Sequence, residues 1–278
     1  MNRPTAGVAF KPQHFDAAIA TPAAGMWFEV HAENYMVAGG PRLMMLEELR
    51  EVRPLSLHGV GLSLGGAERP DALHLAKLAR LVARFDPFLV SEHLAWSRIG
   101  TRCLPDLLPV PRTAEALACV TRNIDIVQQT LGRTILIENP AHYMPNEGAA
   151  WDEPDFLREI VSRTGCGLLI DVNNVAVAAA NLGEDAQAYL AALPHPAIGE
   201  IHIAGHSADP LLGDDLLIDS HDTPVAESVW ALLADLLDHA GHRPVLLERD
   251  GNVPDFATLM AERDRAAALL EGKVHAHA

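Results

Sequence analysis

Imidazole and carboxylate side chains recur along this chain of 278 residues, most of them at the end of a short apolar segment. Imidazoles together with carboxylates suit zinc, iron or manganese and disfavour copper(I), which prefers sulfur ligands. Four histidines and four acids are too many for one ion with about four to six ligands, so two or three carboxylate-bridged ions are expected. The candidate ligands are His58, His93, Glu138, Asp171, Asn174, His202, Asp219, His221 and Glu248.

Any one of these side chains has an ordinary structural explanation. A histidine after a strand is more often a hydrogen-bonded loop residue, and an acid is often a helix cap or a solvated charge. Together they would place charges or strong dipoles at seven consecutive strand ends. Burying such groups unpaired costs roughly several kcal/mol each unless cations compensate them. A metal cluster is therefore the simplest explanation of the whole set.

These side chains need a scaffold that brings successive strand ends together. Short apolar segments alternate with longer helical patterns, which is typical of repeated βα units, and most of the segments are continuously apolar, as in parallel strands covered on both faces. Strands are predicted at Met26–His31, Leu55–Val60, Phe88–Glu92, Thr134–Glu138, Gly167–Asp171, Ile198–Ile203, Leu216–Asp219 and Pro244–Glu248. Helices are predicted at Asp71–Phe85, Thr113–Leu131, Pro154–Thr164, Ala226–Ala240 and Asp255–Leu270.

Eight predicted strands with a helix after the last one indicate a closed (β/α)8 barrel, the TIM-barrel fold of the α/β class. The alternation alone would equally suit an open, doubly wound sheet. The polar residues favour the barrel, because its catalytic groups project from the carboxyl ends of the strands. We therefore predict a single barrel domain over residues 1–278, with its core at about 7–270.

Composition restricts the partners and the location. The net charge of −16 counts against nucleic acid as a partner, because such binding depends on Lys and Arg neutralising phosphates. The sequence has no uncharged apolar run of about 18 residues and no basic-then-apolar N-terminal signal, so a cytoplasmic protein without membrane contact is expected. Cys103, Cys119 and Cys166 lack CxxC spacing and are expected to be reduced thiols.

Seven segments that hold most of the candidate ligands carry a specific resemblance. They resemble the multinuclear non-haem iron-dependent oxidative enzymes, a family long catalogued only as a domain of unknown function, which includes the methanobactin-synthesis oxidase. The match runs from about Gly7 to about Leu270. The segments are Trp27–Met36 (WFEVHAENYM), Leu55–Leu64 (LSLHGVGLSL), Ser91–Ser97 (SEHLAWS), Glu138–Pro140 (ENP), Leu169–Asn174 (LIDVNN), Glu200–His206 (EIHIAGH) and Ile218–Asp222 (IDSHD).

The resemblance implies a barrel of the xylose-isomerase-like type. It implies two or three iron ions in a mixed-valent Fe(II)/Fe(III) state, with O2 as co-substrate. It also implies modification of cysteine residues in a ribosomally synthesised precursor peptide, and a separate protein that recognises this peptide. Zinc and manganese remain the alternative metals, since the donor set alone does not exclude them.

A more distant similarity, to the trinuclear zinc apurinic endonucleases, covers the candidate ligands in the same order. Asn174 departs from that order, because an amide stands where those enzymes carry an imidazole, and one ion is therefore expected to be held less tightly or to keep an open position. Two other functions stay open. One is a zinc- or manganese-dependent hydrolase or isomerase, acting on a sugar or an abasic nucleic acid. The other is a non-catalytic metal-binding scaffold.

Further polar residues stand near the candidate ligands in the sequence, and at each of them a plain role in loop hydrogen bonding competes with a functional one. The candidates for orienting ligands or contacting substrate are Asn139, Asn173, His206 and Asp222. The candidates for lining a peptide channel, after the first predicted strand, are His31, Glu33 and Asn34.

Overall fold

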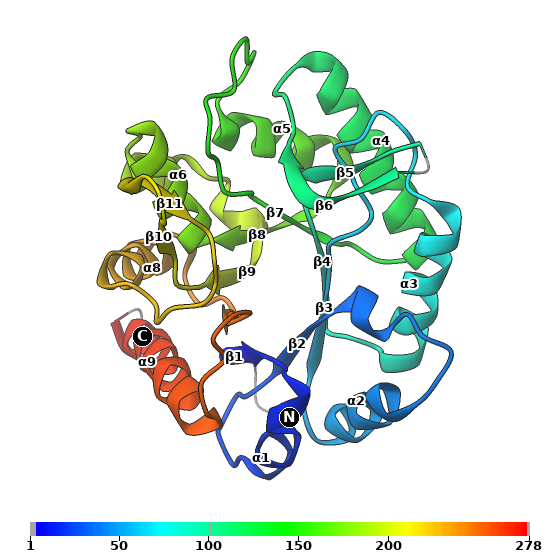
Figure 1. Ribbon diagram of the computed structural model, residues 1–278, viewed down its shortest axis with the longest axis vertical. Coiled ribbons are helices and arrows are strands. Elements are labelled where there is room, and N and C mark those ends of the chain that lie inside the picture. The colour runs from blue at the N-terminus through cyan, green and yellow to red at the C-terminus, as the bar shows by residue number, and fades with distance from the viewer. Residues whose placement is uncertain (1–3, 101, 277–278) are drawn as a thin grey trace.

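The computed structural model describes residues 4–100 and 102–276. Among them, eight parallel strands close into a barrel that a ring of helices surrounds (Figure 1). The order around the barrel is β1-β12-β9-β8-β7-β4-β3-β2, so the predicted (β/α)8 fold is confirmed. The barrel strands are β1 (Ala6–Ala9), β2 (Phe28–His31), β3 (Leu55–Gly59), β4 (Leu89–His93), β7 (Leu136–Glu138), β8 (Gly167–Asp171), β9 (Ile198–Ile203) and β12 (Val245–Leu247).

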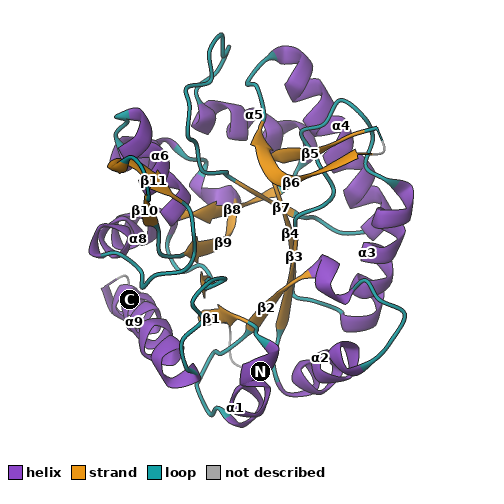
Figure 2. Ribbon diagram, in the orientation of Figure 1, coloured by secondary structure: helices purple, strands orange, loops and turns teal. Residues whose placement is uncertain are grey.

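The helices lie outside the barrel (Figure 2), and several of them begin at a residue whose side chain caps the first turn. Thr113 accepts a hydrogen bond from the backbone N–H of Ala116, and Asp152 accepts one from Asp155, as expected for helix N-caps. All five predicted helices are present with starts within one residue. The helices are α1 (Phe15–Ala20), α2 (Pro41–Val52), α3 (Ala72–Phe85), α4 (Ala114–Leu131), α5 (Glu153–Thr164), α6 (Val172–Leu182), α7 (Ala186–Ala192), α8 (Glu227–Ala240) and α9 (Phe256–Ala276).

One predicted barrel strand is wrong. Leu216–Asp219 falls largely in β11 (Gly213–Ile218), which pairs antiparallel with β10 (Ser207–Asp209) outside the barrel. The first half of β11 is exposed, whereas a barrel strand is covered on both faces. The eighth strand of the barrel is β1 instead, which pairs with both β12 and β2.

The sequence pattern missed β1 because this strand is short and contains small residues. Its Gly7 packs so closely against Trp27 that an added Cβ would lie 2.5 Å from the indole ring. A larger side chain there would have made a stronger strand pattern, but the barrel has no space for it.

Insertions at the carboxyl end of the barrel complete the architecture. A hairpin of β5 (Ala95–Ile99) and β6 (Arg102–Pro109) follows β4, and the β10–β11 hairpin follows β9. A long loop joins β7 to α5 and is the green segment that projects furthest at the top of Figure 1. In the part of the chain that the structure describes, no helix combines the length and apolar character needed to cross a membrane.

Candidate metal centre

The carboxyl ends of six barrel strands bring imidazoles and carboxylates to one mouth. Strand register sets His93 beside Glu138 and Asp171 beside His202. Since side chains alternate along a strand, these residues point inward while their neighbours face the helices. Asp171 and His202 have no exposed surface. The side chains at the strand ends are His58, His93, Glu138, Asp171, His202 and Glu248.

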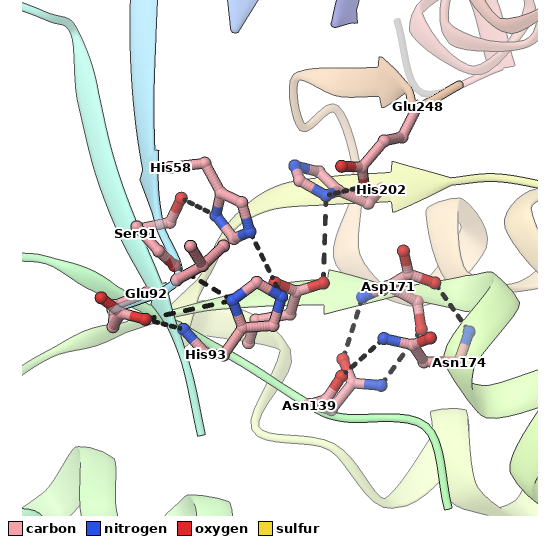
Figure 3. Close-up of polar contacts among 12 residues, drawn as sticks. His58, Ser91, Glu92, His93, Asn139, Asp171, Asn174, His202 and Glu248 are labelled. Atoms are coloured by element: carbon pink, nitrogen blue, oxygen red, sulfur yellow. Dashed lines mark hydrogen bonds and ion pairs between the residues drawn. The ribbon is translucent and has the colours of Figure 1, made fainter. Parts of the chain in front are cut away.

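Glu138 lies at the middle of this arrangement. Its Oε2 is 3.1 Å from His58 Nε2 and 3.2 Å from His93 Nε2. Its Oε1 is 3.9 Å from Nδ1 of His202. Figure 3 shows His202 across the mouth from His58 and His93. Glu138 therefore belongs to two groups of potential metal ligands, one with His58 and His93 and one with Asp171 and His202. A carboxylate shared in this way can bridge two ions.

The histidines on one side of Glu138 are held in orientations that suit ligands. His93 Nδ1 lies 3.0 Å from the carbonyl oxygen of Gly59, and His58 Nδ1 lies 2.8 Å from Ser91 Oγ. A carbonyl oxygen only accepts, so Nδ1 of His93 carries the proton and Nε2 presents its lone pair to the mouth.

A third group of ligand atoms involves the β9–α8 connection. Asp171, His221 and Glu248 offer atoms within 4.8 Å of one another, and Nδ1 of His221 is 3.4 Å from Oε2 of Glu248. Asp219 Oδ1 lies 2.7 Å from the other ring nitrogen of His221. Glu138 belongs to the first and second groups and Asp171 to the second and third, so the mouth can hold adjacent ions joined by carboxylates.

His221 has a backbone conformation that non-glycine residues rarely adopt, with φ at 50°. Its N–H donates to Gly205, and its carbonyl oxygen accepts from Asp250 and Gly251. Such a conformation costs of order 1–3 kcal/mol and persists only where the surroundings impose it. The backbone bonds to Gly205 and Asp250 supply that constraint and turn the imidazole towards Glu248.

Several buried nitrogen and oxygen atoms at the mouth have no hydrogen-bond partner of normal geometry. Bound cations would satisfy these atoms better than their present neighbours do. A buried polar atom without a partner costs about 1–3 kcal/mol, so such atoms normally mark a bound group. The atoms are Glu138 Oε2, Asp171 Oδ2, Asn174 Oδ1, His202 Nδ1 and His221 Nε2. This donor set of oxygen and imidazole nitrogen fits a cluster of iron, zinc or manganese.

The metal-free electrostatics show strong coupling across the mouth. Burial opposes ionisation of Glu138, but His93 and His58 outweigh it and lower its pKa to about 2. Burial also opposes protonation of His58, yet Glu138 raises the pKa of this histidine to about 10. Burial, together with the nearby charge of Asp219, raises the pKa of Asp171 to about 7.

These pKa values predict that metal binding strengthens with rising pH. His58 holds a proton at neutral pH in the metal-free protein and must lose it to become a ligand. Metal and proton compete, so affinity rises up to the pKa near 10, by about tenfold per pH unit for each proton released. Titration with Zn²⁺ against a chelator, at pH values of about 6.5, 7.5 and 8.5, checks this. An affinity independent of pH would contradict a ligand role for His58.

Asn139 and Asn173 each contact a candidate ligand. Asn139 accepts from the Asp171 N–H through Oδ1 and donates to the Asp171 carbonyl through Nδ2, at 2.9 and 3.1 Å. Asn173 donates to Asp219 at 2.7 Å, and its Oδ1 is 2.7 Å from His206 Nδ1. Asn139 therefore fixes the backbone of Asp171, and Asn173 holds the carboxylate of Asp219 in place.

The remaining predicted residues lie at different depths. His31 Nε2 is 3.2 Å from Glu248 and lines the mouth cavity. Glu33 contacts His74 at 3.1 Å, just behind the cavity wall, and exposed Asn34 lines a smaller pocket of about 150 Å³. Asp222 contacts Ser220 and Asn252.

Sequence reasoning assigned no role to Glu29, Glu200 or Asp250. Glu29 and Glu200 stand two residues before His31 and His202, on the same strands. The period-two alternation of a strand places both inside the barrel, and this signal could have identified them. Asp250 forms a further group of possible ligands with His31 and Glu248, and it also pairs with Lys11 at 2.6 Å.

A cavity of about 610 Å³ opens above the candidate ligands. Its floor includes His93, Glu138 and Glu248, and the β5–β6 hairpin contributes Arg98 and Cys103 to its wall. This volume lies within the range of pockets that bind organic ligands.

Solved structures resemble this chain in fold alone. An L-ribulose 3-epimerase has a TM-score of 0.61 at 13% identity, with 100% of this chain and 97% of the epimerase covered. Endonuclease IV from Thermus thermophilus has a TM-score of 0.59 at 17% identity, covering 98% of this chain and 99% of the endonuclease. The fold and the donor set together define a xylose-isomerase-like barrel with a candidate multinuclear metal centre.

Sequence similarity is more specific. The chain belongs to the family described as RiPP precursor modification enzyme MbnB/TglH/ChrH, whose sequence model matches residues 5–271. A relative from Caulobacter sp. (strain K31), named only UPF0276 protein, is 60% identical over 267 residues, which is 96% of each chain. The resemblance predicted from the strand-end motifs is thereby confirmed, and the chain is a member of an enzyme family that modifies ribosomally made precursor peptides.

Proposed function

We propose that this protein is an iron- and O2-dependent oxidase that modifies cysteine residues of a ribosomally synthesised precursor peptide. Two or three irons would occupy the mouth of what we take to be a single barrel domain. The observation that carries the proposal is the position of Glu138, which two groups of ligand atoms share. Family membership supports the peptide substrate.

The contacts between the candidate ligands suggest which of them would share an ion. His58, His93 and Glu138 would hold one ion, and Glu138, Asp171 and His202 a second, with Glu248 3.4 Å from His202. Asp171, His221 and Glu248 would hold a third ion, with Asp219 2.7 Å from His221 and the unpartnered amide oxygen of Asn174 as a further candidate ligand. Iron bound there supplies one-electron redox chemistry and reaction with dioxygen. Dioxygen is the oxidant, and the peptide cysteine is oxidised.

The chain's own residues bind and orient the substrate. The cavity above the ligands admits a peptide side chain, and the β5–β6 hairpin walls one side of it. Asn139 and Asn173 hold Asp171 and Asp219 in position, so a substrate thiol that enters meets a preset ligand geometry.

We also propose that a separate protein recognises the peptide. Exposed apolar side chains on three insertions around the mouth are available for contact with it. They are Ile99 on the β5–β6 hairpin, Tyr143 and Met144 on the β7–α5 loop, and Leu211 and Leu212 at the turn between β10 and β11.

The test uses the full chain, purified without oxygen and analysed for metal. It is then combined with a candidate precursor peptide that contains cysteine. Two or three irons per chain, peptide-dependent O2 uptake and a mass change at a peptide cysteine are expected. One zinc or manganese per chain, with no O2 uptake when the peptide is added, would refute the proposal.

A further inference from the structure

His202 faces acidic groups through both of its ring nitrogens. Nδ1 points towards the mouth, 3.4 Å from Glu248 Oε2 and 3.9 Å from Glu138 Oε1. Nε2 points into the barrel, 3.2 Å from Glu29 Oε1 and 3.8 Å from Glu200 Oε1. The ring is fully buried, and neither nitrogen has a hydrogen bond of normal geometry. The acids around it therefore determine which nitrogen holds a proton.

Glu29 and Glu200 lie one layer deeper in the barrel than the candidate ligands. Strand register places Glu29 beside Ser56, two residues before the pairing of His31 with His58. Both acids are buried, and three of their four carboxylate oxygens have no hydrogen-bond partner. Burial opposes ionisation of Glu29, but His202 and His58 outweigh it and lower its pKa. His202 lies 3.2 Å from the Glu29 carboxylate.

A neutral imidazole has one lone pair and one N–H. If Nδ1 serves the ion shared with Glu138 and Asp171, the proton must lie on Nε2, because a nitrogen that carries a proton cannot ligate. A buried N–H needs an acceptor, and Glu29 is the closest one. The same requirement disfavours an ion held between Glu29 and Glu200, since His202 would then have to present both nitrogens to metals.

We infer that Glu29 is a positioning residue for the metal centre: its carboxylate accepts the Nε2 proton of His202 and thereby aims Nδ1 at the mouth. This inference rests on the proposed function, because it takes His202 as a metal ligand. A carboxylate behind a ligating histidine fixes the ring and raises its basicity. No substrate contact is assigned to Glu29, whose side chain is buried beneath the ligands.

The experiment compares wild-type protein with Glu29→Gln, Glu29→Leu and Ser56→Ala, with Co²⁺ as the probe. Ser56 is the matched control, because it is equally buried, lies beside Glu29 in the strand register and has an unpartnered hydroxyl. Competition with a chromophoric chelator gives affinity and stoichiometry. The visible absorption of bound Co²⁺ reports the geometry of each site.

Glu29→Leu is expected to weaken one Co²⁺ site by about 10–100-fold and to shift its absorption, with the stoichiometry at saturation unchanged. Glu29→Gln keeps an oxygen acceptor but loses the charge, so its affinity should fall between those of wild-type and Glu29→Leu. Should Glu29→Leu fail to fold, Glu29→Gln still has to bind more weakly than wild-type. Ser56→Ala should match wild-type.

Three results would overturn the inference. Wild-type affinity in both Glu29 variants shows that Glu29 does not position His202, while the metal centre itself stands. Loss of one whole Co²⁺ from Glu29→Gln at saturation shows that Glu29 is itself a ligand. Absence of Co²⁺ binding by wild-type protein rejects the proposed metal centre, and the inference with it.

Discussion

Replacing Glu138 with glutamine is expected to remove at least one metal ion per chain and to abolish turnover. The carboxylate lies 3.1 and 3.2 Å from two histidines and 3.9 Å from a third, and a glutamine amide offers one oxygen in place of two. Loss of a group that only orients a ligand costs about 10–100-fold in metal affinity or activity. Loss of a bridging ligand should therefore exceed about 100-fold. Metal analysis and peptide mass spectrometry measure both effects.

Glu153→Gln is the matched control for this change. Glu153 is also buried and also contacts a histidine, His142 of the β7–α5 loop, at 2.8 Å. The pair lies outside the groups of candidate ligands that contain Glu138. Its metal content and turnover should equal those of the wild-type protein. Equal metal content in Glu138→Gln and wild-type protein would show that the Glu138 carboxylate does not bridge two metal ions.

Gly205→Ala is expected to destabilise the protein and to empty the site built on His221. A Cβ at position 205 would lie 2.1 Å from the carbonyl oxygen of Thr223, and backbone atoms there cannot rotate away. The Gly205 carbonyl oxygen also accepts the N–H of His221, so any relief of the clash moves this histidine. Overpacking of this kind costs about 1–3 kcal/mol, and the upper end is expected here.

Chemical denaturation of the metal-free protein measures the loss of stability, and Co²⁺ titration measures the loss of the site. Gly39→Ala is the control, because a Cβ there would meet nothing within 4 Å. Its free energy of unfolding should stay within about 0.5 kcal/mol of wild-type. A Gly205→Ala protein as stable as Gly39→Ala would show that the connection to Thr223 is not rigid.

Much of the centre follows from local sequence pattern. A histidine or acid that ends a buried parallel strand must project at the carboxyl edge, so positions such as His93, Asp171 and His202 could be placed from sequence before their neighbours were known. The first residue of a helix also depends on nearby residues, as at α4, where the side chain of Thr113 caps the first turn.

Other features depended on contacts between segments far apart in the chain. The place of β1 in the barrel comes from its pairing with β12, more than two hundred residues away, and its own four residues hold little pattern. The segment Leu216–Asp219, at the end of the β10–β11 hairpin, looked like a barrel strand because an apolar run is similar in both settings. Only the exposure of its outer half and the closure of the barrel without it distinguish the two.

The sequence by itself therefore determined the fold class, the family and the kinds of ligand at the strand ends, because alternation and capping act within a few residues. Tertiary structure decided which of those ligands face one another. It placed Glu138 between two sides of the mouth, turned His221 inward through backbone bonds to distant residues and set Glu29 behind His202. These relations depend on barrel closure and strand register, which long-range pairing sets and no local pattern encodes.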